Sequence, residues 1–382
     1  MKALTNWKIA GFKGTIQAVT GFGKSRLGVI AAGEFCRKSA TAKWLVLVPT
    51  TNLLDQWKLE FVKFGYADIL PQVEFVCYQS AYKFDDKEYD GIVGDEIHVG
   101  LSHEYRKVFF RNSFSKILLL TATIDDPDKR SFLMSLAPIV YTMTINRALE
   151  LGLISDYIMY NLAVPFTKEE QSAYNANQQR YNYYEHLLGG RYHAFDNAKL
   201  MLSLDEASKE DKKNATVFYG CIRKRKDLCN NNSNKVRVAA RIVQKFPTQY
   251  AIFFSESIKP AQDLHEMLPD ISMCFHSKMT KTQRKEALKS YMDRRTKIRL
   301  ISSARALNAG FNVEEASLCI SGSGTSKELD QIQRLGRGLR AAENKLARFI
   351  NLYTPGTQEV KWVTSRSKQF NPKWITSIDE IL

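Results

Sequence analysis

The stretch Thr15-Ile-Gln-Ala-Val-Thr-Gly-Phe-Gly-Lys-Ser25 decides the fold, because an apolar strand runs directly into a glycine-rich turn and then a helical pattern. Gly21 and Gly23 let the backbone turn so tightly that its N–H groups point inward, as a phosphate-binding loop requires. The helix that follows adds the positive end of its dipole. Lys24 would reach the β- and γ-phosphates of a nucleotide, and the Ser25 hydroxyl would bind Mg²⁺. The stretch therefore predicts a nucleotide-binding α/β domain.

The segments around this loop alternate between strands and helices. Apolar residues recur at helical spacing over Lys24–Lys38 and Asn52–Phe64. Apolar runs typical of buried strands are Thr15–Val19, Trp44–Val48, Val73–Cys77, Gly91–Val93 and Lys116–Leu120. Because strands that alternate with helices form parallel sheets with helices on both faces, this part of the chain predicts an α/β fold.

The alternation stops in the middle of the chain and then resumes. Residues 167–235 are polar and rich in Asn and Tyr, which predicts a solvated helical insertion with a loose loop at Asn230–Asn234. The alternative is a subdomain that contacts nucleic acid, because Tyr and Arg side chains stack on bases. Further strands and helices are predicted at Tyr250–Phe254, Pro260–Met267, Lys281–Met292, Ile298–Ser302, Ser317–Ser321, Lys327–Leu335 and Arg348–Tyr353. We therefore predict two α/β domains with parallel sheets in tandem, over residues 1–150 and 151–357, and a C-terminal tail over 358–382.

The composition excludes several classes of protein. Of the 382 residues, 44% are hydrophobic and 25% are charged, which excludes a mostly disordered chain. No apolar run approaches the ~20 residues of a membrane-spanning helix, so we expect no membrane partner. The first residues lack the apolar stretch of a secretory signal, so we expect a protein of the cytoplasm, in a bacterium or a virus-infected cell, or of the nucleus, and not a secreted one. The six cysteines are scattered without a C-x-x-C pair, which suggests neither a zinc site nor disulfides.

The charge favours a nucleic-acid partner without establishing one. The 55 Lys and Arg residues outnumber the 40 Asp and Glu residues and leave a net charge of +15. Clustered cations gain free energy when they release counterions from phosphates. Many basic proteins have no such partner, so the charge has to be combined with motifs.

An acidic pair follows another predicted strand, within Gly94-Asp-Glu-Ile-His98. Open α/β sheets place their ligands at the carboxyl ends of the strands, and this pair lies at such an end. Asp95 would hold Mg²⁺ through water, and Glu96 would activate the water that attacks the γ-phosphate. On its own, His98 would more often be structural than catalytic. The pair predicts a metal site beside the phosphate-binding loop.

Two further segments carry polar side chains that suit phosphoryl transfer. In Gln333-Arg-Leu-Gly-Arg-Gly-Leu-Arg340, Arg337 and Arg340 are three residues apart and so share one helical face. Arginines aimed at a γ-phosphate stabilise the charge of the transition state, whereas the plainer alternative is a solvated basic helix end. The segment Leu120-Thr-Ala-Thr-Ile124 closes a predicted strand with two hydroxyl groups.

Taken in order, these segments resemble the motifs of the superfamily 2 helicases and translocases of the DEAD/DEAH-box type. The segments similar to motifs I, Ia, II, III, IV, V and VI are Ala18–Ser25, Val48–Trp57, Asp95–His98, Thr121–Thr123, Ile252–Ser257, Ser303–Asn312 and Gln333–Arg340. The Leu-Leu-Asp-Gln-Trp sequence that ends at Trp57, and the connector Asn146–Ile154, are most similar to the branch that contains XPB and UvsW. Two features depart from the family pattern: no upstream glutamine motif contacts adenine, and Asn312 replaces the usual aspartate of motif V.

The resemblance implies two RecA-like domains that bind ATP and Mg²⁺ in the cleft between them. The nucleotide-binding residues would be Thr20, Gly21, Gly23, Lys24, Ser25 and Gly310, with Ser25 and Asp95 as metal ligands. The catalytic residues would be Asp95, Glu96, Arg337 and Arg340, with Gln333 and His98 as a coupling pair across the cleft. The nucleic-acid backbone would be contacted by Thr50, Thr51, Ser255 and Ser303.

The function predicted from this resemblance is an ATP-dependent helicase or translocase, with DNA favoured over RNA and with a role in repair, recombination or replication. Four alternatives stay open at this point. They are a double-strand translocase or remodeller that does not unwind, an RNA helicase, the motor part of a restriction system, and a nucleic-acid-binding protein that does not hydrolyse ATP.

Overall fold

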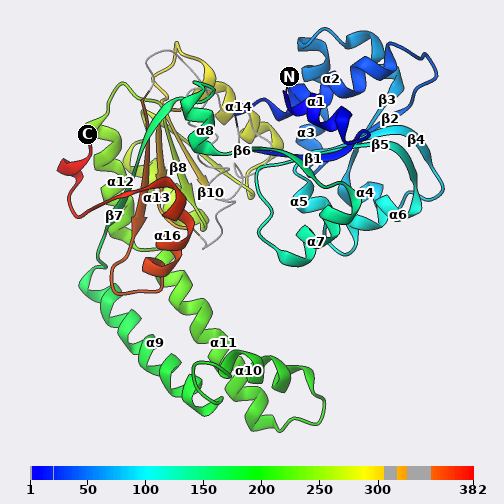
Figure 1. Ribbon diagram of the computed structural model, residues 1–382. Helices are drawn as coiled ribbons and strands as arrows, with labels where there is room; N and C mark the ends of the chain where they lie inside the picture. Colours follow the sequence, from blue (N-terminus) through cyan, green and yellow to red (C-terminus); the bar gives the residue numbers. More distant parts are fainter. Residues whose placement is uncertain (1, 20, 305–315, 325–345) are drawn as a thin grey trace. The chain divides into compact units, whose positions relative to one another are not determined.

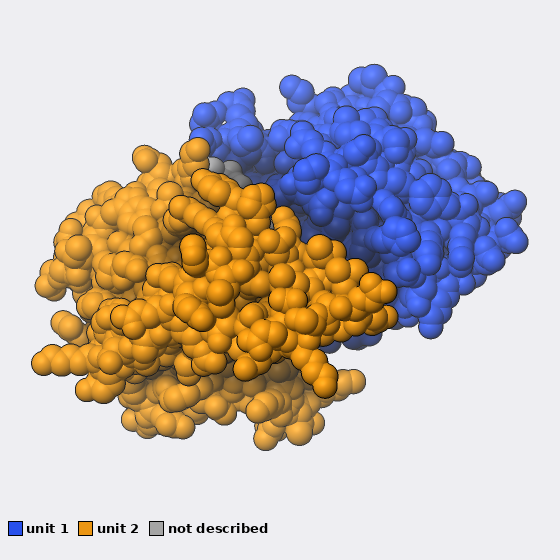
Figure 2. All heavy atoms as spheres, turned by 90° about the horizontal axis from the view of Figure 1, so that it is seen from below, with its two compact units in different colours: residues 1–158, 306–317, 327–348 blue, residues 159–305, 318–326, 349–382 orange. Residues whose placement is uncertain are grey.

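The computed structural model describes residues 2–19, 21–304, 316–324 and 346–382. These residues divide into two compact units, which Figure 2 colours separately. Unit 1 consists mostly of residues 2–158, and unit 2 consists mostly of residues 159–304 and 349–382. Each unit has a sheet of its own with helices around it (Figure 1).

Unit 1 is built on a six-stranded parallel sheet with the order β3-β2-β4-β5-β1-β6. Its strands are β1 (Lys13–Ala18), β2 (Trp44–Val48), β3 (Val73–Cys77), β4 (Glu88–Gly94), β5 (Ser113–Thr121) and β6 (Ile139–Met143). Gln17 lies beside Thr121, and Gly94 lies beside Leu119. The carboxyl ends of β1, β4 and β5 therefore meet at one edge of the sheet, where the predicted motifs begin.

Helices cover both faces of this sheet because its central strands are apolar on both sides. All five residues of β2 are fully buried, as expected for a strand of a covered parallel sheet. Leu45 and Leu47 belong to an apolar cluster with residues of α4 to α7, whereas α2 and α3 meet Val93 on the other face. The helices are α1 (Lys2–Ile9), α2 (Lys24–Cys36), α3 (Thr51–Lys63), α4 (Tyr78–Ala81), α5 (Ile97–Gly100), α6 (Val108–Arg111), α7 (Pro127–Leu136) and α8 (Ile145–Glu150).

Unit 2 is built on a seven-stranded sheet with the order β13-β7-β12-β11-β8-β10-β9. Parallel pairing joins β13 to β7, β11 to β8, β8 to β10 and β10 to β9. The strands are β7 (Asp156–Ala163), β8 (Ala251–Ser255), β9 (Ser272–His276), β10 (Leu300–Ala304), β11 (Leu318–Ser321), β12 (Leu346–Tyr353) and β13 (Lys373–Ile375). The helices that pack in this unit are α12 (Ser233–Lys245), α13 (Ile258–Met267), α14 (Lys281–Met292) and α16 (Glu359–Ser367).

The predicted α/β class with two sheets is confirmed, and most of the predicted strands lie within two residues of their observed bounds. The strands β6, β7, β9 and β13 were not predicted. The predicted helix Lys327–Leu335 lies outside the described residues. Among the described helices, none combines the length and the apolar character that crossing a bilayer requires.

The polar middle of the chain forms three helices that we call the helical arm: α9 (Lys168–Leu187), α10 (Ala194–Ser203) and α11 (Lys209–Asn230). Figure 1 shows α9 and α11 side by side, extending away from the sheet of unit 2, with α10 at their far end. Thr167 begins α9 with a capping box, because its side chain and that of Glu170 each bond the other's backbone N–H. The three helices share a small apolar cluster of their own around Leu188, Ala198 and Phe218.

The expectation of a loose loop at Asn230–Asn234 is wrong, because this segment is a buried junction between α11 and α12. The Asn232 amide donates to Val164 O at 3.1 Å and to Thr354 Oγ1 at 3.0 Å. Its side-chain oxygen accepts from Asn234 N at 3.0 Å, which caps α12. An asparagine run favours loops by composition, but here the side chains of Asn232 and Asn234 bond to other parts of unit 2.

Candidate nucleotide-binding site

The glycine-rich loop after β1 has the backbone that its sequence predicts. Gly21 and Gly23 both have φ of 89°, a left-handed conformation that favours glycine. Gly23 is the N-cap of α2, so the helix begins at Lys24 with its first N–H groups turned toward the loop. The loop and the helix start thus supply backbone donors at the carboxyl edge of the sheet, as an anion site needs.

Lys24 is buried although it is charged, with an exposed fraction of 8%. Its Nζ donates to Ala18 O at 2.8 Å and lies 3.5 Å from Val19 O. A lysine ammonium has three donors, so these carbonyls at the end of β1 hold the cation without using its full capacity. Ser25 follows as the second residue of α2 and is half-buried.

Asp95 lies directly after β4, at the same edge of the sheet. Its backbone N donates to Leu47 O at 2.8 Å, which continues the ladder between β4 and β2. Its carboxylate accepts from Trp57 Nε1 at 2.9 Å and from Glu96 N at 3.0 Å. A carboxylate has about four acceptor positions, so capacity for further ligands is left.

Burial raises the pKa of Asp95 to about 6, and the negative charge of Glu96 adds to this rise. The Trp57 hydrogen bond, the charge of Lys24 and the Glu96 N–H act in the opposite direction. The positive charge of Lys24 lowers the pKa of Asp95, so the cation of the loop and the carboxylate of the acidic pair interact electrostatically. A buried carboxylate with a raised pKa beside a cation is a feature of functional sites.

The donor set fits Mg²⁺ bound together with a nucleotide. This ion commonly uses one or two carboxylates plus substrate phosphates and water, and not an all-protein cage. Asp95 offers a carboxylate with free acceptor capacity, and the Ser25 hydroxyl is the second candidate ligand. Within the described residues, no group of three or more His, Cys, Asp or Glu side chains is arranged to hold a metal by itself.

Glu96 and His98 lie together beyond Asp95. His98 Nδ1 is 3.4 Å from Glu96 Oε2, and both side chains are mostly buried. Glu96 has φ of 45° and ψ of 53°, a left-handed conformation that is unfavourable for a residue with a side chain. Such local strain is concentrated at active sites, where the surrounding structure holds it in place. Lys129 Nζ fixes the backbone here by donating to His98 O at 2.8 Å.

The four residues predicted to contact nucleic acid differ in accessibility. Thr51 is exposed at the first turn of α3, and the hydroxyl of Thr50 is buried without a hydrogen bond in the described structure. Ser255 is buried, and its hydroxyl donates to Ser257 O at 2.7 Å. Ser303 is also buried, and its hydroxyl has no partner among the described residues. Of these four residues, only Thr51, at the start of α3, is therefore accessible to a ligand in the described structure.

Five predicted site residues lie outside the described residues: Thr20, Gly310, Gln333, Arg337 and Arg340. Their roles stay predictions. The residues that the structure brings together at one sheet edge are Gly21, Gly23, Lys24, Ser25, Asp95, Glu96 and His98.

Trp57 has a role at the site that its sequence pattern does not predict. The pattern makes it an apolar position of a helix and part of a motif, yet its indole N–H donates to the Asp95 carboxylate. A signal was available, because a buried tryptophan usually finds an acceptor for its N–H. The acceptor itself could not be found, because it lies 38 residues away in the chain.

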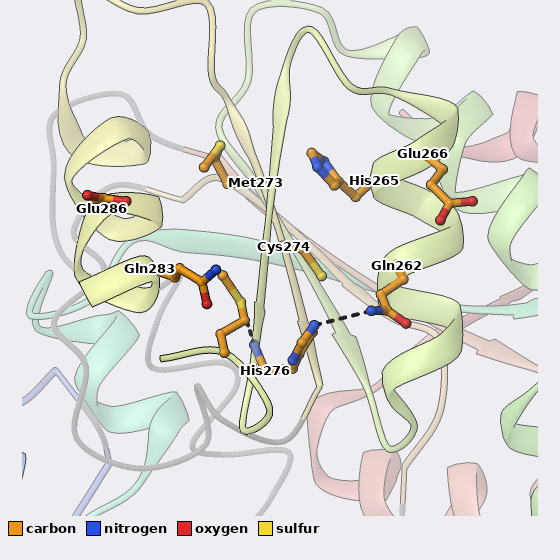
Figure 3. A pocket seen from close by; sticks show the side chains of 9 residues that line it. Gln262, His265, Glu266, Met273, Cys274, His276, Gln283 and Glu286 are labelled. Atoms are coloured by element: carbon orange, nitrogen blue, oxygen red, sulfur yellow. Dashed lines mark hydrogen bonds between the residues drawn. The ribbon is translucent and has the colours of Figure 1, made fainter. Parts of the chain in front are cut away.

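One hollow in unit 2 is separate from these residues. A cavity of about 310 Å³ lies between α13, β9 and α14, and Figure 3 shows the side chains that line it. His276 and Gln262 face one another there, with 3.4 Å between their side-chain nitrogens. None of the predicted site residues lines this cavity.

Comparisons with known proteins agree with this arrangement. Residues 1–126 match the family model described as "Type III restriction enzyme, res subunit", and residues 234–342 match "Helicase conserved C-terminal domain". A curated relative, the DNA 3'-5' translocase XPB2 of Sulfurisphaera tokodaii, is 24% identical over 365 residues, which cover 91% of this chain and 79% of the relative.

A solved structure shares the fold. The Pyrococcus furiosus Hef helicase domain superposes with a TM-score of 0.57 at 15% identity, and the match covers 95% of this chain and 97% of that domain. With the two parallel-sheet units, this likeness confirms the predicted tandem RecA-like fold. The chain therefore carries the domains of a superfamily 2 helicase or translocase, is similar to the XPB branch, and is a nucleic-acid-dependent ATPase.

Proposed function

We propose that this chain is a DNA helicase or translocase that hydrolyses ATP at the carboxyl edge of the unit 1 sheet. The observation that carries the proposal is the convergence of Lys24 and the Asp95–Glu96 pair at the ends of β1 and β4. DNA is favoured as the track because the curated relative is described as a DNA translocase. The net charge of +15 supports a polyanionic partner.

Each residue of this edge has a distinct proposed role. The loop N–H groups and the start of α2 bind the phosphates, and Lys24 exchanges its carbonyl partners for the β- and γ-phosphate oxygens. Asp95 and Ser25 hold Mg²⁺. The bound ion would neutralise the charge that develops on the phosphates. Glu96 orients and deprotonates the attacking water, and His98 keeps Glu96 in place through their 3.4 Å contact.

The remaining roles belong to residues outside the described parts of the chain and follow the family pattern. We propose that Thr20 and Gly310 contact the nucleotide, that Arg337 and Arg340 stabilise the charge of the transferred phosphoryl group, and that Gln333 couples the two domains. Thr50 and Thr51 are proposed to contact the nucleic-acid backbone, together with Ser255 and Ser303. The two serines require a local rearrangement to do so, because both are buried.

The experiment compares ATP hydrolysis by the wild type, Lys24→Ala and Lys38→Ala, without nucleic acid and with single-stranded DNA, duplex DNA, branched DNA or RNA. Lys38 is an exposed lysine just after α2 and serves as the matched control. We expect DNA to stimulate the wild type and Lys38→Ala, and Lys24→Ala to be inactive with unchanged folding. Hydrolysis by Lys24→Ala at the wild-type rate would refute the assignment of the loop. Stimulation by RNA alone would refute the assignment to DNA.

A second candidate is translocation along duplex DNA without strand separation, because the curated relative is described as a translocase. Displacement of a third strand from a triplex reports movement along a duplex, whereas release of a labelled strand from a fork reports unwinding. Triplex displacement without fork unwinding would establish the second candidate. Unwinding at a comparable rate would establish a helicase.

A further inference from the structure

Trp57 joins three elements of the nucleotide-binding edge. It lies on α3 with an exposed fraction of 1%, and its Nε1 donates to Asp95 Oδ2 at 2.9 Å. Its ring reaches α2 at Gly28, where a Cβ atom would lie 2.7 Å from Trp57 Cη2 and 2.9 Å from Val93 Cγ1. Gly28 is one helical turn beyond Lys24 and lies on the same face of α2. One indole on α3 therefore contacts both the helix of the phosphate loop and the Asp95 carboxylate.

The same residue is fixed to the helix whose first turn is open to a ligand. Thr51 is exposed at the start of α3, and Trp57 lies six residues later, or about 9 Å along the helix axis. A helix moves as a rigid body over this length, so a displacement of its first turn shifts the indole against Asp95. No other described side chain donates a hydrogen bond to this carboxylate; its second donor is the backbone N–H of Glu96.

We propose that Trp57 is a positioning residue with two effects. It holds the Asp95 carboxylate in the orientation that binds the metal–nucleotide complex, and it shifts this carboxylate when nucleic acid binds at the start of α3. The coupling part of this inference rests on the proposed function, because it needs nucleic acid at Thr50 and Thr51. The positioning part needs only the binding of a nucleotide with Mg²⁺. The two parts are therefore tested by separate measurements.

The test replaces Trp57 by Phe, which removes the N–H donor and keeps an aromatic ring. The matched control is Trp44→Phe, the same change at a fully buried tryptophan of the same unit, whose Nε1 has no hydrogen-bond partner in the described structure. The first measurement is the equilibrium affinity for a fluorescent ADP analogue, with Mg²⁺ and with EDTA. The second is the factor by which DNA stimulates hydrolysis, and DNA affinity and thermal unfolding are measured alongside.

We expect Mg²⁺ to strengthen ADP binding about 10-fold less in Trp57→Phe than in the wild type, the effect of losing one hydrogen bond to a charged group. Affinity in EDTA should be unchanged, and the factor of DNA stimulation should fall although DNA still binds. Trp44→Phe should keep both the Mg²⁺ effect and the stimulation. If both variants behave alike, Trp57 only fills space and the inference is wrong.

A further variant keeps the test decisive if Trp57→Phe does not fold. Gly28→Ala keeps the tryptophan and its N–H donor but pushes the indole ring away from α2, which displaces the N–H from Asp95, so we expect the same loss of the Mg²⁺ effect. A wild-type Mg²⁺ effect in Gly28→Ala would overturn the inference. Failure of the proposed function looks different: the wild type itself would then not be stimulated by DNA, while the ADP measurement would still report on Trp57.

Discussion

Replacing Lys235 by Met, or Glu359 by Gln, removes one half of a buried ion pair at the base of the helical arm. Lys235 Nζ lies 2.8 Å and 2.6 Å from the two carboxylate oxygens of Glu359, and it also donates to Cys229 O at 3.0 Å. The side chains are only 2% and 5% exposed. Thr354 N donates to the same carboxylate at 2.8 Å, so the pair links the end of α11, the start of α12, the end of β12 and α16.

The expected magnitude follows from burial. Breaking a buried pair costs about 3–5 kcal/mol, because the remaining charge has neither water nor a counter-ion. For a domain the size of unit 2 this corresponds to a fall of roughly 6–20 °C in Tm. Lys235→Met should lie at the upper end, since Glu359 would keep only the Thr354 N–H. Glu359→Gln should lie at the lower end, since the amide oxygen still accepts from both Thr354 and Lys235.

The assay is thermal and urea unfolding of the full chain, with the double variant Lys235→Met/Glu359→Gln and one control. In the double variant no charge is left buried and the Thr354 N–H keeps an acceptor, so much of the lost stability should return. The control is Glu34→Gln, which breaks the pair of Lys8 and Glu34 at the same 2.6 Å distance but with side chains 42% and 31% exposed. It should cost less than about 1 kcal/mol. A double variant as unstable as the sum of the two single variants would refute the reasoning.

Four further outcomes are expected. Glu96→Gln should bind ATP normally and hydrolyse it at least about 100-fold more slowly. A binding assay and a single-turnover assay measure these two properties separately. Normal turnover would show that Glu96 does not activate the water. The protonated form of Asp95 cannot hold Mg²⁺, and the pKa of Asp95 is raised to about 6. The value of kcat/KM for ATP should therefore fall about tenfold per pH unit below pH 6 and should not depend on this group above pH 6. A flat profile down to pH 5 would contradict this. Arg337→Ala should lower kcat by about 1,000-fold with little change in ATP affinity, and a wild-type kcat would remove Arg337 from the site. DNA affinity should fall linearly on a log–log plot against salt, whereas a flat response would place the positive charge away from DNA.

The parts of the fold that the sequence predicts well are those whose signal is local. Trp44–Val48 and Val73–Cys77 were predicted with their observed bounds, because each is a short, mostly apolar run. β7 was missed because Asn161 interrupts its apolar pattern. The structure buries this amide completely and pairs it with Ser367 Oγ at 3.0 Å and with Asn351 at 2.9 Å. These partners are 206 and 190 residues away, so no local pattern contains them.

The candidate site also has features that the sequence predicts and features that it does not. The glycine loop and the acidic pair are contiguous motifs, and their chemistry follows from residue type and from their position after a strand. What the sequence could not provide is the environment of each group: the carbonyls that hold Lys24, the left-handed backbone of Glu96 and the indole on Asp95. Burial of Ser255 and Ser303 was likewise not foreseen, because a hydroxyl in a motif gives no indication of whether it faces solvent.

The helical arm leaves unit 2 and returns to it at one point. Glu170, in the first turn of α9, accepts from Ser233 N at 2.9 Å, and Asn234 donates to Pro165 O at 3.0 Å, so the incoming and outgoing chains touch. An inserted segment whose two ends contact each other can be gained, lost or exchanged without altering the strand order of the sheet around it. The outer part of the arm, between the contacts that Tyr174 and Cys229 make with unit 2, can therefore be replaced by another sequence in evolution or by a foreign domain in protein engineering.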